Sequence, residues 1–246
     1  MIIFMRIDKL LCELNIGTRS QVKELLKRGQ ISVNGEIIKR PEEKVDELTA
    51  EIVYGGKAYH YRPFVYYMMN KPAGIVTATK DNSERTVLDL FKEQYAETHN
   101  GALSGVPLKD LFPVGRLDKD TVGLLLLTND GELAHRLLSP AHHIPKQYYV
   151  ETNDEVSKEA IERLSNGVPI GEEQLTRPAI VKVLEPKKTT LTITEGKFHQ
   201  VKRMFEAVGL KVTYLKRLSM GNLVLDEGLQ EGQIRELKQE EVMNLC

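Results

Sequence analysis

The amino-terminal part of the chain carries a regular pattern of apolar and polar positions that predicts two short helices and a hairpin. Over residues 7–14 the apolar positions recur at intervals of three and four, which places them on one face of a helix. Thr18 and Gln21 have the spacing of a capping box, and the helix that they begin carries its apolar stripe to Gly29. Asn34-Gly35 then separates two short apolar runs, which predicts a strand, a primed turn and a second strand.

A break precedes the rest of the chain, in which strands and helices are mixed. Gly55-Gly56 and residues 59–63 carry turn and polar residues, and we interpret them as a linker. The four leucines at 124–127 indicate a strand that is buried on both faces, and Asp130 is placed to cap the helix after it. Residues 100–105 are rich in Gly and Ser and indicate a surface loop. The other apolar patterns predict strands at 65–69, 146–150, 178–184 and 191–194 and helices at 87–95, 133–138, 154–166 and 199–208. In the last of these helices the polar stripe would consist of His199, Lys202, Arg203 and Glu206.

Composition limits the class of protein. With 246 residues, of which 41% are apolar, the chain can bury one large core or two smaller ones. Its net charge is −1, so any surface for nucleic acid must be local.

Two distant cysteines fit neither a disulfide framework nor a zinc site, which favours a reduced, cytoplasmic protein. No stretch has the pattern of a signal peptide or a membrane span. His142-His143 has no further ligand at a suitable spacing, so we expect no metal.

A basic stripe follows one face of the second predicted helix. Arg19, Lys23 and Lys27 recur every four residues, away from the apolar face. Charges at this spacing most often form a solvated helix face. The segment TRSQVKELLKRGQISVNGEIIKRP, however, resembles the small helix-pair RNA-binding module named after ribosomal protein S-four. The resemblance implies that these three residues contact phosphates and read few bases.

The most informative segment is GRLDKDTVGLLLLTNDG, at residues 115–131. Arg116 and Asp118 stand directly before the leucine-rich strand, where charged groups are costly unless they are paired or used. On spacing alone, a surface ion pair in a turn explains them equally well. The segment resembles the catalytic motif of the pseudouridine synthases, in the RsuA branch that acts on ribosomal RNA. Three more segments resemble the other motifs of this family, in the expected order: MNKPAGIVT, the KxYxV pattern at 146–150, and EGKFHQVKRM.

The resemblance implies a role for each matching residue. Asp118 would be the catalytic carboxylate, and whether it attacks the sugar, attacks the base or abstracts a proton is left open. Tyr148 would stack on the target base, although a strand tyrosine usually belongs to the core, and Arg116 would fill the place that this base leaves. The cation that pairs with the carboxylate would be Lys202, with the adjacent Arg203 as the alternative. The residues of this domain assigned to RNA binding are Arg116, Lys146 and Arg203.

Charge outside the motifs is unevenly distributed. Residues 197–217 hold six Lys or Arg and one Glu, which is a strong local positive patch. Residues 222–246 hold two basic and six acidic residues, so the chain lacks the basic extension of some relatives that modify large-subunit RNA. Lys71 ends a predicted strand, where the alternatives are a solvated side chain and a phosphate contact.

The expected fold is α+β. Residues 1–62 would form the S-four-type module, and residues 63–246 a pseudouridine synthase domain on a mixed, mainly antiparallel sheet. The resemblance implies conversion of one uridine of 16S ribosomal RNA to pseudouridine, at the position called 516, in an assembling small (30S) subunit. The reaction needs no cofactor, nucleotide or metal, and we expect a monomer that binds no membrane. Two alternatives are the same reaction on 23S RNA and a non-catalytic RNA-binding assembly factor.

Overall fold

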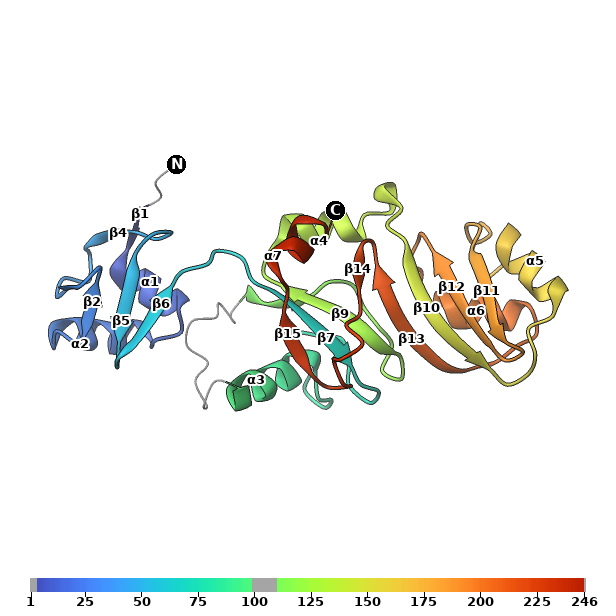
Figure 1. Cartoon of the computed structure of the whole chain (residues 1–246), viewed down its shortest axis with the longest axis horizontal. Coiled ribbons are helices and arrows are strands. Elements are labelled where there is room, and N and C mark those ends of the chain that lie inside the picture. Colours follow the sequence, from blue (N-terminus) through green and yellow to red (C-terminus); the bar gives the residue numbers. More distant parts are fainter. Residues whose placement is uncertain (1–3, 99–109, 246) are drawn as a thin grey trace. The chain divides into compact units, whose positions relative to one another are not determined.

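The computed structural model describes residues 4–98 and 110–245 (Figure 1). The chain divides into two compact units, one with Met1–Val65 and Lys92–Leu111, the other with Tyr66–Phe91 and Phe112–Cys246. The loop predicted at 100–105 lies outside the described residues. The boundary predicted between residues 62 and 63 stays a prediction. No helix among the described residues is long and apolar enough to cross a membrane.

The first unit contains two helices and small antiparallel sheets. β1 pairs with β4, and a second sheet has the order β3-β2-β5-β6. Its elements are β1 (Phe4–Arg6), α1 (Ile7–Glu13), α2 (Arg19–Lys27), β2 (Ile31–Val33), β3 (Glu36–Ile37), β4 (Lys44–Asp46), β5 (Glu51–Tyr54) and β6 (Lys57–His60). The predicted helix pair and hairpin are confirmed.

Local hydrogen bonds explain where these elements begin. The Thr18 hydroxyl accepts a hydrogen bond from the Gln21 amide, and the Gln21 side chain accepts one from the Thr18 amide, so the capping box is confirmed. Asn34 and Gly35 both have positive φ, as the primed turn requires. The apolar faces of α1 and α2 pack on β2 and β5 in one core, which contains Leu10, Leu26 and Ile52.

The linker predicted at 55–63 is wrong in its first half. Gly55 and Gly56, both with positive φ, form the turn of an antiparallel hairpin between β5 and β6. Two consecutive glycines therefore mark a tight turn here, and β6 extends to His60.

The second unit is built on a mixed sheet, which the described residues form with nine strands. The order along its main path is β11-β12-β10-β13-β9-β7-β15, and β9 and β13 are its parallel neighbours among otherwise antiparallel pairs. Its strands are β7 (Tyr66–Lys71), β8 (Phe112–Pro113), β9 (Val122–Thr128), β10 (Lys146–Thr152), β11 (Ile180–Glu185), β12 (Lys188–Ile193), β13 (Val212–Met220), β14 (Leu223–Val224) and β15 (Ile234–Glu236). Its helices are α4 (Gly131–Leu138), the 3-10 turn η2 (Pro140–His142), α5 (Lys158–Asn166), α6 (Gln200–Ala207) and α7 (Gln239–Met243), and α3 (Val87–Thr98) begins in it. The α+β prediction is confirmed.

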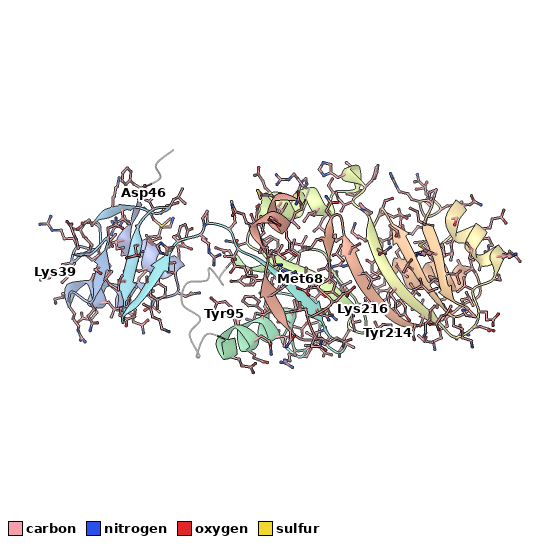
Figure 2. All side chains as sticks on the ribbon, in the orientation of Figure 1. Lys39, Asp46, Met68, Tyr95, Tyr214 and Lys216 are labelled. Atoms are coloured by element: carbon pink, nitrogen blue, oxygen red, sulfur yellow. The ribbon has the colours of Figure 1, made fainter. Side chains whose placement is uncertain are left out.

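Strand β9 is the centre of this unit. All seven of its residues are buried, which confirms the strand buried on both faces. Met68, labelled in Figure 2, lies opposite Leu126 and belongs to the core under α4. Asp130 caps α4 by accepting a hydrogen bond from the Leu133 amide at 2.9 Å, as expected.

Two helices begin later than their apolar patterns predict. α5 begins at Lys158, because the Ser157 hydroxyl caps it. α6 begins at Gln200, because His199 adopts a left-handed conformation with φ of 47°. His199 therefore stands before the helix and not on its polar stripe.

Candidate active site

The loop between β8 and β9 holds Asp118 at the entrance of the central strand. Thr77 fixes the residue before it, since its hydroxyl donates to the Leu117 carbonyl at 2.8 Å and accepts from the Leu117 amide at 3.2 Å. The Thr121 amide closes a turn by donating to the Asp118 carbonyl at 3.1 Å. The Asp118 side chain remains 25% exposed, so it is both fixed and accessible.

A buried lysine supports this loop from below. Lys71, at the end of β7, has no exposed surface. Its ammonium group donates to the carbonyls of Thr121 at 2.9 Å and Asp118 at 3.1 Å, with Pro72 at 3.0 Å and Lys119 at 3.3 Å also within reach. Burial lowers the pKa of Lys71 to about 8, although the nearby charges of Asp120 and Asp118 oppose this. Lys71 is therefore neither solvated nor placed to contact a phosphate, and both interpretations from the sequence are wrong. Its ammonium group instead donates hydrogen bonds to backbone carbonyls of the loop.

Two side chains, the cationic Lys202 of α6 and the potentially cationic His199 just before this helix, lie against the Asp118 carboxylate. The Lys202 ammonium lies 3.2 Å from Asp118 Oδ2 and 2.6 Å from Asp120 Oδ1. His199 Nε2 lies 3.4 Å from Asp118 Oδ1, on the other carboxylate oxygen. Burial alone would lower the pKa of Lys202, but hydrogen bonds to Asp120 and Asp118 outweigh it and raise the pKa. The same bond lowers the pKa of Asp120.

Arg203 points to a different partner. Its guanidinium contacts Glu172 at 3.2 Å and donates to the carbonyls of Phe198, at 2.9 Å, and Ile170. Of the two adjacent bases considered from the sequence, Lys202 is the one that approaches Asp118, while Arg203 ties the 170–172 loop to the start of α6.

Tyr148 lies on a row of residues that crosses three strands. It is opposite Arg217 of β13, and Arg217 is opposite Gly123 of β9, five residues after Asp118. A Cβ on Gly123 would lie 2.3 Å from the Arg217 carbonyl oxygen, so only glycine permits this close approach of the two strands. The Tyr148 side chain is 8% exposed. In Figure 2 the labels Tyr214 and Lys216 mark the part of β13 directly before Arg217.

Two cations beside Tyr148 are buried. Arg217 donates through Nε to the Leu124 carbonyl at 2.8 Å, and its Nη2 has no hydrogen-bond partner among the described residues. The Lys146 ammonium donates to the Ile144 carbonyl at 3.1 Å. Burial, and secondarily the charge of Arg217, lower the pKa of Lys146. The RNA contact assigned to Lys146 stays a prediction, and its burial does not favour it.

The other residues predicted to bind RNA are accessible. Arg116 is exposed and makes no hydrogen bond or ion pair within the described parts of the chain. Arg19, Lys23 and Lys27 are exposed along α2 in the first unit. Their roles stay predictions.

Sequence reasoning missed several residues that the geometry brings to the site. The sequence motifs do not indicate the partners of Lys71, and they assign no role beside Asp118 to His199 or Asp120. No local signal existed for the burial of Lys71, because the strand pattern does not specify the direction of a side chain at its end. None existed for His199, because its approach depends on a left-handed backbone before α6.

The arrangement suits chemistry at an accessible carboxylate. Asp118 is held on one oxygen by Lys202 of α6 and on the other by His199, while the loop that carries it is fixed by Thr77 and Lys71. An accessible carboxylate with a lysine ammonium at 3.2 Å can act as a nucleophile or as a base. No group of three or more His, Cys, Asp or Glu side chains within residues 4–98 and 110–245 could hold a metal ion.

Comparison with known families identifies the class of protein. The family described as RNA pseudouridylate synthase matches residues 65–207, and the S4 domain matches residues 5–49. The chain therefore belongs to the RNA pseudouridylate synthase family, and its catalytic domain follows an amino-terminal RNA-binding S4 domain.

Individual relatives are similar to this chain over nearly its whole length. The chain is 46% identical to the "Uncharacterized RNA pseudouridine synthase YtzG" of Bacillus subtilis over 97% of each chain. It is 39% identical to the "Ribosomal small subunit pseudouridine synthase A" of Vibrio cholerae, over 98% of this chain and 99% of that protein. A crystal structure of a pseudouridylate synthase, 36% identical, covers 98% of this chain and 100% of its own with a TM-score of 0.67.

Proposed function

We propose that this RNA pseudouridine synthase converts one uridine of 16S ribosomal RNA, at the position called 516, within an assembling small subunit. The observation that carries the proposal is the Asp118 carboxylate, accessible at the entrance of β9 and held by Lys202 and His199. The likeness over nearly full length to a protein named for the small ribosomal subunit supports the choice of RNA. The enzyme is proposed to act in the cytoplasm as a monomer.

The proposed reaction rearranges the bonds of one nucleotide, with Asp118 as the assisting residue. The glycosidic bond between C1′ and N1 breaks, uracil turns, and C1′ bonds to C5, while C5 loses a proton and N1 gains one. Asp118 is the group proposed to assist the breaking of the bond, as a nucleophile or as a base. The overall change is redox-neutral and releases no product other than the modified RNA.

The uridine must leave its stack before it reacts, at a cost of roughly a few kcal/mol. Tyr148 offsets part of this cost by stacking on the extruded base, which contributes about 1–3 kcal/mol. Arg116, exposed two residues before Asp118, is proposed to occupy the space that the base leaves in the RNA.

Lys202 is proposed to position the Asp118 carboxylate and to pair with its charge, and this is tested by Lys202→Gln. We expect kcat to fall by about 100-fold because the charged carboxylate loses its nearest cation. Asp120→Asn is the matched control, since Asp120 also bonds Lys202 but is 73% exposed and has no proposed role in the chemistry. Equal losses of kcat in both variants would mean that the contact between Lys202 and Asp118 is not specifically required for the reaction.

The basic stripe of the S4 domain is proposed to bind phosphates. Replacing Arg19, Lys23 and Lys27 by Gln should reduce the slope of log Kd against log salt by about two to three, because fewer counterions are released. The slope is measured by RNA binding at several salt concentrations. Lys44→Gln together with Lys57→Gln, two exposed lysines of the same unit outside the stripe, should leave it nearly unchanged. An unchanged slope in the stripe variant would refute the assignment.

The function itself is tested by mapping pseudouridines in both ribosomal RNAs of cells with and without the gene, by carbodiimide modification. We expect one site of 16S RNA to lose its signal and an active copy of the gene to restore it. Loss of a 23S site instead would establish the large-subunit alternative. If no site changes in either RNA, the alternative of a non-catalytic assembly factor is favoured.

A further inference from the structure

We infer that Phe198 and His199 form a stacking surface for an unpaired RNA base next to the target uridine. The inference rests on the proposed function, because it supposes that RNA reaches Asp118. It assigns a binding role to Phe198, which the reaction described above does not use, and a second contact to His199, which also lies against Asp118.

The two rings are already stacked on each other. Their centroids lie 3.8 Å apart and their planes differ by 19°. Phe198 is nevertheless 68% exposed, which is unusual for a phenylalanine. His199 therefore covers one face of the ring, and a large aromatic surface remains open to a second flat group.

Backbone contacts hold this surface in place. The guanidinium of Arg203 donates to the Phe198 carbonyl at 2.9 Å. On the other side of the pair, the Lys197 amide donates to the Gln200 side chain at 2.9 Å. The rings thus project from a segment that is fixed at both ends, which limits the entropy lost when a base binds.

The surface adjoins the proposed catalytic carboxylate. His199 Nε2 lies 3.4 Å from Asp118 Oδ1, so Phe198 is one ring removed from the reacting group. Exposed aromatic rings are the groups on which proteins stack the bases of single-stranded RNA.

The target uracil is assigned to Tyr148, so Phe198 takes a different base. Stacking on a phenylalanine tolerates any base, because every base presents a π face. The contact therefore contributes to binding the extruded strand and leaves the choice of nucleotide to other contacts.

The first test is Phe198→Leu, which keeps an apolar side chain and removes the aromatic face. We expect KM for the RNA to rise about tenfold with kcat within about twofold of wild type. Phe64→Leu is the control, since Phe64 is 49% exposed in the first unit, and it should change neither constant. Wild-type constants in Phe198→Leu would overturn the inference. A fall in kcat at unchanged KM would also overturn it, because the ring would then act on the reacting base.

The second test does not depend on activity. The chain contains no tryptophan, so Phe198→Trp introduces a single indole that can still stack and that can be excited selectively over the nine tyrosines. Addition of a short unstructured RNA should reduce its emission by about half or more as a base covers the indole. Phe64→Trp, treated in the same way, should be little affected. Equal responses of the two variants would overturn the inference.

The two tests separate the inference from the proposed function. If wild-type protein forms no pseudouridine in either ribosomal RNA, the proposed function fails, and the fluorescence comparison alone decides whether Phe198 binds RNA bases. If wild-type protein is active and both Phe198 tests are negative, the inference fails and the proposed function stands.

Discussion

Asp118→Asn is expected to lower the rate of pseudouridine formation on the order of 10³-fold or more while the Kd for RNA stays within about twofold of wild type. The change keeps the size of the side chain and removes its charge. An amide cannot act as the nucleophile or base, and it loses the attraction of Lys202, which lies 3.2 Å away. Activity is measured by single-turnover conversion of a 16S transcript, and binding by filter retention of the same RNA.

The matched control is again Asp120→Asn. This carboxylate lies two residues further along the same loop and bonds the same lysine at 2.6 Å, but is largely exposed. We expect a change of less than about fivefold. If Asp118→Asn retains activity and Asp120→Asn loses it, the catalytic carboxylate has been assigned to the wrong residue of the loop.

Lys71→Met is expected to lower kcat about 100-fold with little change in stability at neutral pH. The variant removes the donor for the carbonyls of Asp118 and Thr121, and a displacement of about 1 Å at a reacting group is enough for such a loss. The stability change is small, within about 1 kcal/mol, because methionine also removes the cost of burying a charge. Urea unfolding at pH 7 and single-turnover kinetics measure the two effects separately.

The same variant gives a prediction for alkaline pH. The pKa of Lys71 is lowered by burial to about 8 in the folded protein, from 10.5. Between these values the unfolded chain binds more protons at this residue, so the contribution of Lys71 to stability rises with pH across this window. The unfolding free energy of wild type relative to Lys71→Met should therefore increase by roughly 1–3 kcal/mol from pH 8 to 10.5. A constant difference would mean that the folded protein does not perturb this lysine.

Much of the fold was predictable because the relevant interactions are local. The Thr18 capping box, the Asn34-Gly35 turn and the Asp130 cap each involve residues within a few positions, so their sequence patterns are sufficient. The strand at 124–127 was predictable because a strand covered on both faces needs an unbroken apolar run. The hairpin at Gly55-Gly56 was missed because glycine pairs occur in linkers and in tight turns alike.

The site was only partly predictable, because its contacts connect distant segments. Asp118 and Lys202 could be named from motifs, yet the choice between Lys202 and Arg203 required the orientation of α6. Lys71 reaches carbonyls 47 to 50 positions away, and a strand pattern does not specify the direction of a terminal side chain. His199 approaches Asp118 through a left-handed backbone that the periodicity of a helix does not predict.

The parallel contact between β9 and β13 has a consequence for how the enzyme matures. It joins residues 93 positions apart, where Arg217 donates to the Leu124 carbonyl, and Gly123 must sit directly against the opposing strand. Pairings that distant are slow to form, since a long loop must close before they gain any stabilisation. Because α6 directly precedes β13, we expect the carboxylate and its cation to meet only after this late step. A newly made chain would then form no pseudouridine until its sheet has closed.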